Sequence, residues 1–191
     1  LRNAKLDYDF EKFFPTNDPE LERYNAFRKK FGGDNDFLMI GIPREAGIYN
    51  VELLSMVDSL TSALERLDNF KKVSSPTRLT EPIITPIGVF QTPYLRFESD
   101  STLTADSTRI AQDPRIHGTF FSEDGKAMLM LIDAGTGLSK LKSDALLKDV
   151  EQAIKASGLQ DVQLAGRIHG QFHYIRMMLE VCPTTWLSLR N

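Results

Sequence analysis

The sequence predicts an α+β fold in which helices cover a sheet on at least one side. Residues 127–132 are apolar at every position, which is typical of a strand with both faces covered. Residues 36–43 begin with Asp36 and continue as a second run that is apolar on both faces. Segments 50–68 and 143–157 each place apolar side chains along one side of a helix. The strands therefore need helices beside them, and the chain supplies those helices.

Residues 118–134 predict a β-hairpin. Asp124 and Gly125 fit the two positive-φ positions of a type I′ turn, the connection whose twist suits antiparallel strands. Glu123 and Lys126 flank this turn, so we expect their opposite charges to face each other across the hairpin.

The chain has 191 residues, and we interpret 1–191 as one domain in three parts. Residues 1–76 predict a βαβαβ part, and 77–100 an extended insertion. Residues 101–191 predict a helix, the hairpin, a helix, a strand and a C-terminal helix. The predicted elements are strand 5–10, helix 19–31, strand 36–43, helix 50–68, strand 71–75, helix 104–113, strand 126–134, helix 143–157, strand 162–165 and helix 169–182.

Capping and breaking residues mark the predicted helix ends. Asp18 followed by Pro19 is a strong start for the first helix. Asn50 and Ser143 are predicted N-caps of later helices. Pro183 is expected to end the last helix, because proline lacks the N–H that a helix interior needs.

The insertion at 77–100 differs in composition from its surroundings. Pro82, Pro86 and Pro93 interrupt it, and its apolar residues follow no helical period. We expect an extended segment outside the core, whose apolar side chains still lie against something.

The order of the elements predicts a more specific fold. Strands at 36–43 and 71–75 enclose one helix, and strands at 126–134 and 162–165 enclose another. This βαββαβ order is that of a ferredoxin-like split βαβ sandwich, here interrupted by the Pro-rich insertion.

Composition excludes several classes of protein. The net charge is −3 and no dense cluster of Lys and Arg is present, which argues against a nucleic-acid partner. The single cysteine, Cys182, rules out an internal disulfide. The longest apolar run falls far short of the roughly 20 residues of a membrane span. Because the chain begins at Leu1 without Met, we expect it to be a piece of a longer protein.

Catalytic chemistry finds little support. His169 and His173 share a helix face at a spacing that suits a transition metal, but no third ligand is indicated, and a polar helix edge explains them as well. Cys182 is a candidate nucleophile with His117, His169 or His173 as its base, and a buried inert thiol is the favoured alternative. We predict no catalytic residue, no cofactor and no metal site.

The last helix is rich in methionine. Met177 and Met178 lie beside aromatic residues and would form either core packing or an adaptable apolar surface. Core packing is the favoured interpretation.

Three stretches resemble one family. The N-terminal stretch is similar to the segment after the first transmembrane helix of resistance–nodulation–division (RND) transporters; it contains LDYDFEKFFP, DPE and an aromatic-rich helix. The similarity is to the branch of these transporters that is related to the mycobacterial membrane protein large (MMPL) family. Two later motifs, DPRIHG and SEDGK, resemble a linking segment and a β-hairpin of that family. The C-terminal motifs AGRIHGQF and MMLEV resemble the strand and helix that precede its second transmembrane segment. The resemblance spans nearly the whole chain.

The resemblance implies a non-catalytic porter domain, the first extracytoplasmic loop of a proton-driven exporter of lipids or other hydrophobic compounds. It implies a periplasmic location at the bacterial inner membrane. The partners would be a second porter domain, the parent's transmembrane helices and, in some parents, further copies. The family has no fixed substrate-binding motif in this loop, so the resemblance assigns no substrate-binding residue to this chain. We expect an apolar surface that meets the substrate or the second porter domain, comprising Phe90, Tyr94, Phe97, Met177 and Met178.

Two alternatives remain open. One is a free-standing soluble ligand-binding module of ferredoxin-like fold. The other is a metal-dependent enzyme that uses His169 and His173.

Overall fold

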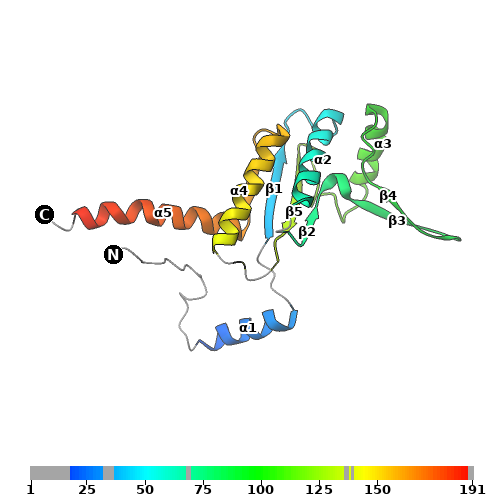
Figure 1. Ribbon diagram of the computed structural model, residues 1–191. Coiled ribbons are helices and arrows are strands. Elements are labelled where there is room, and N and C mark those ends of the chain that lie inside the picture. Colours follow the sequence, from blue (N-terminus) through cyan, green and yellow to red (C-terminus); the bar gives the residue numbers. More distant parts are fainter. Residues whose placement is uncertain (1–17, 32–36, 68–69, 136–137, 139, 189–191) are drawn as a thin grey trace.

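A computed structural model of the chain describes residues 18–31, 37–67, 70–135, 138 and 140–188 (Figure 1). The predicted strand at 5–10 lies outside the described residues. Helices combine with antiparallel sheets, which confirms the predicted α+β class.

The main sheet has four strands in the order β2-β5-β1-β6, and each neighbouring pair is antiparallel. β1 pairs with β5 along its whole length, from Phe37 with Asp133 to Pro43 with Ala127. The two strands that the sequence marks as apolar therefore occupy the centre of the sheet, as predicted (Figure 1). The strands are β1 (Phe37–Pro43), β2 (Lys72–Ser74), β5 (Ala127–Asp133) and β6 (Gln163–Ala165).

The core lies between this sheet and two helices, α2 (Val51–Glu65) and α4 (Lys140–Ser157), which contact each other. Alternate residues of β1 and β5 are buried and pair across the strands: Leu38 with Ile132, Ile40 with Met130, and Ile42 with Met128. The helices bury Leu54, Val57, Leu60, Leu64, Leu147 and Val150 in the same cluster. Each such side chain stabilises the fold by about 1.5–3 kcal/mol relative to exposure.

The opposite face of the sheet is only half-buried. Met39, Leu129 and Leu131 on this face retain partial exposure. Both central strands are thus fully covered on one face alone, whereas their sequences predict cover on both.

The Pro-rich insertion forms a second sheet of two strands. β3 (Thr80–Thr85) and β4 (Gly88–Pro93) pair antiparallel, and the hairpin projects from the body (Figure 1). A two-stranded ribbon contains edge strands only, and edge strands tolerate the missing N–H of proline. Pro82 and Pro93 therefore lie within strands, where the sequence predicted no regular element.

The base of the insertion belongs to the core, which corrects the prediction that this segment lies outside it. Tyr94 and Leu95 follow β4, and each is only 3% exposed. They join the core cluster with Leu103 and Ile110 from α3 (Asp100–Ala111). A short 3₁₀ helix, Pro76–Arg78, precedes the hairpin.

Two helices lie near the ends of the described chain. α1 (Pro19–Phe31) begins as predicted, and Asp18 Oδ1 accepts a hydrogen bond from the Glu20 amide at 2.8 Å. α5 (Arg167–Ser188) packs on β1, β6 and α4, and its Ile168 and Ile175 are buried. Beyond these residues α5 extends away from the body (Figure 1).

Several predicted helix ends are wrong. α3 begins before residue 104 because the Ser99 hydroxyl caps it, accepting from the Thr102 amide at 3.4 Å. α4 begins at Lys140, so Ser143 lies inside the helix and is not its N-cap. α5 continues through Pro183 to Ser188, so this proline does not end the helix as predicted. The predicted Asn50 cap of α2 is confirmed.

The predicted hairpin at 118–134 is reduced to its second strand. The amides of Phe120 and Phe121 both donate to the Ile116 carbonyl, at 2.8 and 3.2 Å, so the chain before the turn is coiled. An isolated bridge joins Phe121 to Met128, flanked by two backbone hydrogen bonds of 2.9 Å, from the Ser122 amide to the Ala127 carbonyl and from the Leu129 amide to the Phe120 carbonyl. The Phe120 amide would face β5 in a regular antiparallel pair, and here it is used in the local coil instead.

The turn itself is also different from the prediction. The Gly125 amide donates to the Ser122 carbonyl at 3.0 Å. Of the two residues that were expected to have positive φ, Asp124 and Gly125, only Gly125 does, with φ 65°. A type I′ turn needs positive φ at both central positions, so this is not one. Lys126 Nζ pairs with Glu45 at 2.9 Å, where pairing across the turn with Glu123 was expected.

Candidate functional site

The five residues predicted as an apolar contact surface do not form one patch. Phe90 on β4 is 51% exposed and Met177 on α5 is 58% exposed, and these two elements lie far apart in Figure 1. Phe97 and Met178 are half-buried. Tyr94 is buried, so its assignment to a contact surface is wrong.

Tyr94 instead belongs to a polar cluster at the base of the hairpin. Its hydroxyl donates to Asp113, and Arg115 Nη2 donates to Asp113 Oδ2 at 2.5 Å and to the Tyr94 oxygen at 2.9 Å. Burial, followed by the hydrogen bond to Asp113, raises the pKa of Tyr94 to about 12. Hydrogen bonds from Arg115 and Tyr94 hold the pKa of Asp113 well below its usual range. The cluster fixes the hairpin to the segment after α3.

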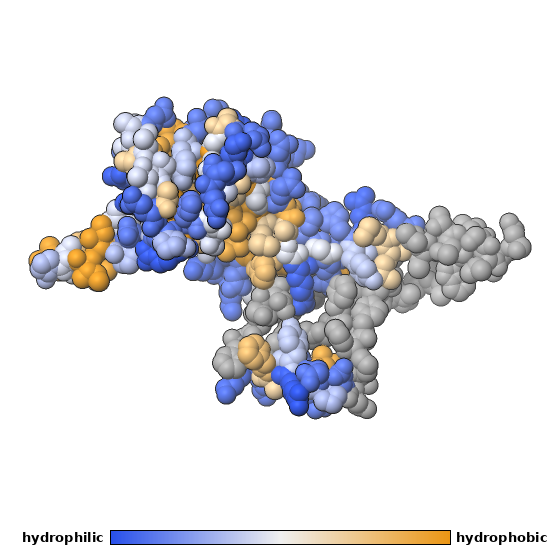
Figure 2. All heavy atoms as spheres, turned by 180° about the vertical axis from the view of Figure 1, so that it is seen from behind, coloured by the Kyte–Doolittle hydropathy of each residue, from blue (hydrophilic) through white to orange (hydrophobic). Residues whose placement is uncertain are grey.

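The tip of the β3–β4 hairpin exposes apolar side chains on every side. Ile83 pairs with Phe90 and Ile84 with Val89, and successive pairs face opposite sides of a strand ribbon. Ile84 is 84% exposed and Ile87, in the turn, 86%. Apolar colour is visible at this projecting end in Figure 2. We name these five residues the hairpin tip.

His169 and His173 lie one turn apart on α5, with ring centroids 4.3 Å apart. Burial, followed by the charge of His173, lowers the pKa of His169. Among the described residues, no three His, Cys, Asp or Glu side chains are grouped so as to hold a metal ion. The Cys182 side chain lies outside the described set, so its role stays a hypothesis.

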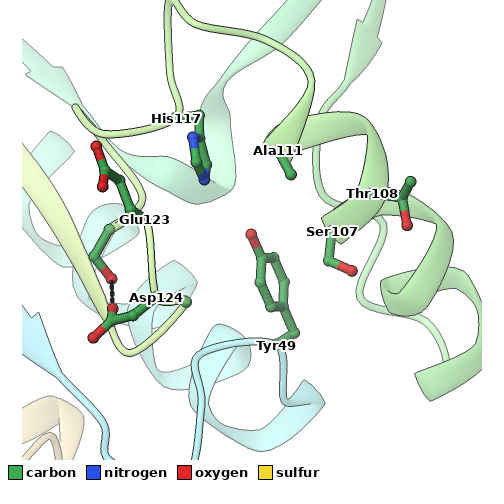
Figure 3. A pocket seen from close by; sticks show the side chains of 9 residues that line it. Tyr49, Ser107, Thr108, Ala111, His117, Glu123 and Asp124 are labelled. Carbon is green, nitrogen blue, oxygen red and sulfur yellow. Dashed lines mark hydrogen bonds between the residues drawn. The ribbon is translucent and has the colours of Figure 1, made fainter.

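A hollow of about 400 Å³ lies between α3 and the turn after it (Figure 3). Tyr49 precedes α2, and its hydroxyl lies toward the middle of the hollow. Ser107 and Thr108 of α3 lie on one side, and Glu123 and Asp124 on the other. The remaining lining residues are Ala111, His117, Ser122 and Gly125.

Local contacts hold this lining in place. The Tyr49 ring stacks on buried Phe121, with centroids 6.4 Å apart. Burial raises the pKa of Tyr49, so its phenol stays protonated at neutral pH. Ser122 donates to Asp124 Oδ1 at 2.6 Å, and the Lys126 amide donates to the same oxygen at 3.0 Å. These bonds lower the pKa of Asp124, which therefore remains ionised.

Sequence reasoning did not find this hollow. Its residues come from three separate segments, and no short motif connects Tyr49 with Ser107 or Glu123. The sequence indicates His117 only as a candidate base for Cys182. The one local signal was the Ser122–Gly125 turn, which the sequence marks as a turn and not as part of a site.

Within the described residues, no helix is both long and apolar enough to cross a bilayer. No protein-family model matches the chain, and no curated protein matches it. The family resemblance therefore rests on the sequence motifs alone.

Proposed function

We propose that the chain is an extracytoplasmic porter domain of a proton-driven RND-type exporter of lipids or other hydrophobic compounds. In this role it performs no catalysis. It forms part of the substrate pathway on the periplasmic side of the bacterial inner membrane, beside a second porter domain of the same parent. The sequence motifs described above are the first support for the proposal.

The strand connections are the second support. β1, α2 and β2 form one unit, and β5, α4 and β6 form another, with the sheet order β2-β5-β1-β6. We propose that this is the split βαβ arrangement of a ferredoxin-like fold, with the β3–β4 hairpin and α3 inserted between its halves. That is the architecture expected of a porter domain.

The hairpin tip is the observation that most favours a hydrophobic partner. Residues 82–95 contain no charged side chain, and the tip exposes five large apolar residues. Soluble monomers rarely expose contiguous apolar patches beyond a few hundred Å², and larger ones mark interaction sites. A tip that is apolar on both faces suits an occupant that surrounds it, such as a hydrophobic substrate or a socket in the second porter domain.

The proposal is tested by export from cells that contain the full-length parent. Ile87→Glu places a charge at the tip and is expected to reduce efflux of the hydrophobic dye Nile red. Thr104→Glu, at an exposed position of α3, is the matched control and should leave efflux unchanged. Equal efflux by both variants at equal membrane abundance would contradict the proposal.

The hollow beside Tyr49 favours a second candidate, a free-standing ligand-binding module. Its volume lies within the range of small-molecule sites, about 300–1,000 Å³. A parent protein without membrane spans beside this domain would favour the module over the porter domain.

A further inference from the structure

We propose that the hollow beside Tyr49 binds an organic cation with N–H donors, that is, a primary ammonium or a guanidinium group. The inference rests on the lining of the hollow. It goes beyond the porter function and holds whether or not that function is correct.

The charge of the lining is the first argument. Glu123 and Asp124 are the charged residues among the nine that line the hollow, and both are acidic. Two basic residues adjoin the lining along the chain, and both have partners elsewhere. Arg109 Nη2 donates to the carbonyls of Pro93 and Tyr94, each at 2.7 Å. Lys126 Nζ lies 2.9 Å from Glu45. The hollow therefore attracts cations and repels carboxylates and phosphates.

The hydrogen-bond inventory is the second argument. Ser107 and Thr108 donate their hydroxyl hydrogens to the Thr104 carbonyl, at 2.9 and 3.1 Å. Ser122 donates its hydroxyl hydrogen to Asp124. Each hydroxyl has a single hydrogen, so the oxygens of Ser107 and Thr108 remain as acceptors.

Acceptors thus outnumber donors around the hollow. The Glu123 carboxylate accepts only, and the second oxygen of Asp124 adds another acceptor. Among the described contacts, donors come from the Tyr49 hydroxyl and the His117 ring, which face the centre in Figure 3. Such a lining is satisfied by a ligand that is rich in N–H groups, since ammonium and guanidinium groups donate and do not accept.

The position of Tyr49 completes the site. Stacking on Phe121 fixes the ring, so the phenol is held between the acidic wall and α3. A rigid aromatic side chain whose hydroxyl lies toward the middle of the hollow gives a ligand a fixed contact point.

The binding test uses ¹⁵N-labelled chain and n-butylamine, which is cationic at pH 7. We expect saturable shifts of the Ser107, Thr108 and Gly125 amides. Neutral n-butanol, which has the same carbon chain, should give weaker shifts that do not saturate. Tetramethylammonium has the charge without N–H donors and should bind more weakly than n-butylamine. Equal responses to n-butylamine and n-butanol, or no saturable response to n-butylamine, would overturn the proposal.

A matched pair of variants locates the effect. Glu123→Gln should weaken n-butylamine binding about two- to fivefold, the range of an exposed ion pair. Glu65→Gln makes the same change at the far end of α2 and should bind as the wild type does. Both positions are exposed, so both variants should keep the wild-type spectrum elsewhere. Equal weakening in both variants, or none in Glu123→Gln, would refute the assigned site, while the porter proposal keeps its separate export assay.

Discussion

The Arg96 guanidinium lies 2.6 Å from the fully buried carboxylate of Asp106. The Arg96 amide donates to the other carboxylate oxygen at 2.7 Å, and Arg109 Nη2 lies 3.4 Å from Oδ1. A buried carboxylate is tolerated only when it is paired and hydrogen-bonded. These contacts join the end of the insertion to α3, and so fix the hairpin relative to the core.

Removing this carboxylate should loosen the insertion. We expect Asp106→Ala to lower the free energy of unfolding by about 1–3 kcal/mol, because the part-buried Arg96 amide then lacks its acceptor. Urea unfolding monitored by circular dichroism measures the change. Thr104→Ala, at an exposed position of the same helix, is the control and should change stability little. Equal effects of the two substitutions would contradict the assigned role of Asp106.

Tyr94 should make stability depend on alkaline pH. Its pKa is about 12 in the folded chain and about 10 when unfolded. Between these values the unfolded chain releases the proton and the folded chain keeps it, so rising pH favours unfolding. The contribution is complete below about pH 10 and is lost toward pH 12. Unfolding at pH 8 to 11 should therefore show the stability advantage of wild type over Tyr94→Phe becoming smaller. An advantage that stays constant with pH would rule out this linkage.

Two glycines near the start of α5 should respond in opposite directions to alanine. Gly166 has φ 108°, and an added Cβ would lie 2.5 Å from the Phe37 carbonyl oxygen of β1. Gly166→Ala should therefore destabilise the chain by about 2 kcal/mol or more. Gly170 lies within the helix, and apart from its chain neighbours and its own helix backbone no described atom lies within 4 Å of an added Cβ, so Gly170→Ala should stabilise by up to about 1 kcal/mol. Thermal unfolding of the two variants distinguishes them, and a stable Gly166→Ala variant would refute the close approach.

The hairpin tip should be dispensable for folding. Ile84→Glu is expected to change the free energy of unfolding by less than about 0.5 kcal/mol, since its side chain is 84% exposed. Ile40→Glu, in the fully buried centre of β1, should prevent folding. A large stability loss in Ile84→Glu would mean that the tip packs against the chain itself, which would remove the argument for an external partner.

The central sheet was predictable because its signals are local. β1 and β5 are continuous apolar runs, and Asn50 caps α2 with a 3.0 Å hydrogen bond to the Leu53 amide. The sequence does not indicate that α3 begins at Asp100, because Ser99 and the segment before it have the composition of the insertion. The sequence does not predict the β3–β4 hairpin, because proline usually interrupts regular structure, although a ribbon of edge strands accommodates it.

The candidate sites were less predictable for a different reason. Tyr94 is in a Pro-rich stretch of apolar residues. The hydrogen-bond partners of its buried hydroxyl, Asp113 and Arg115, come from a later segment of the chain. The hollow requires Tyr49 to meet α3 and the Ser122–Gly125 turn, and only the folded chain brings them together. No periodicity or spacing within one segment contains that information.

The most direct test of the porter proposal is the coding sequence on both sides of this chain, followed by topology mapping of the complete protein. The proposal predicts an apolar span of roughly 20 residues before Leu1 and another after Asn191. It also predicts that a cysteine placed at exposed Thr104 reacts with a membrane-impermeant maleimide in intact spheroplasts. Polar flanks, or labelling only after lysis, would contradict the account.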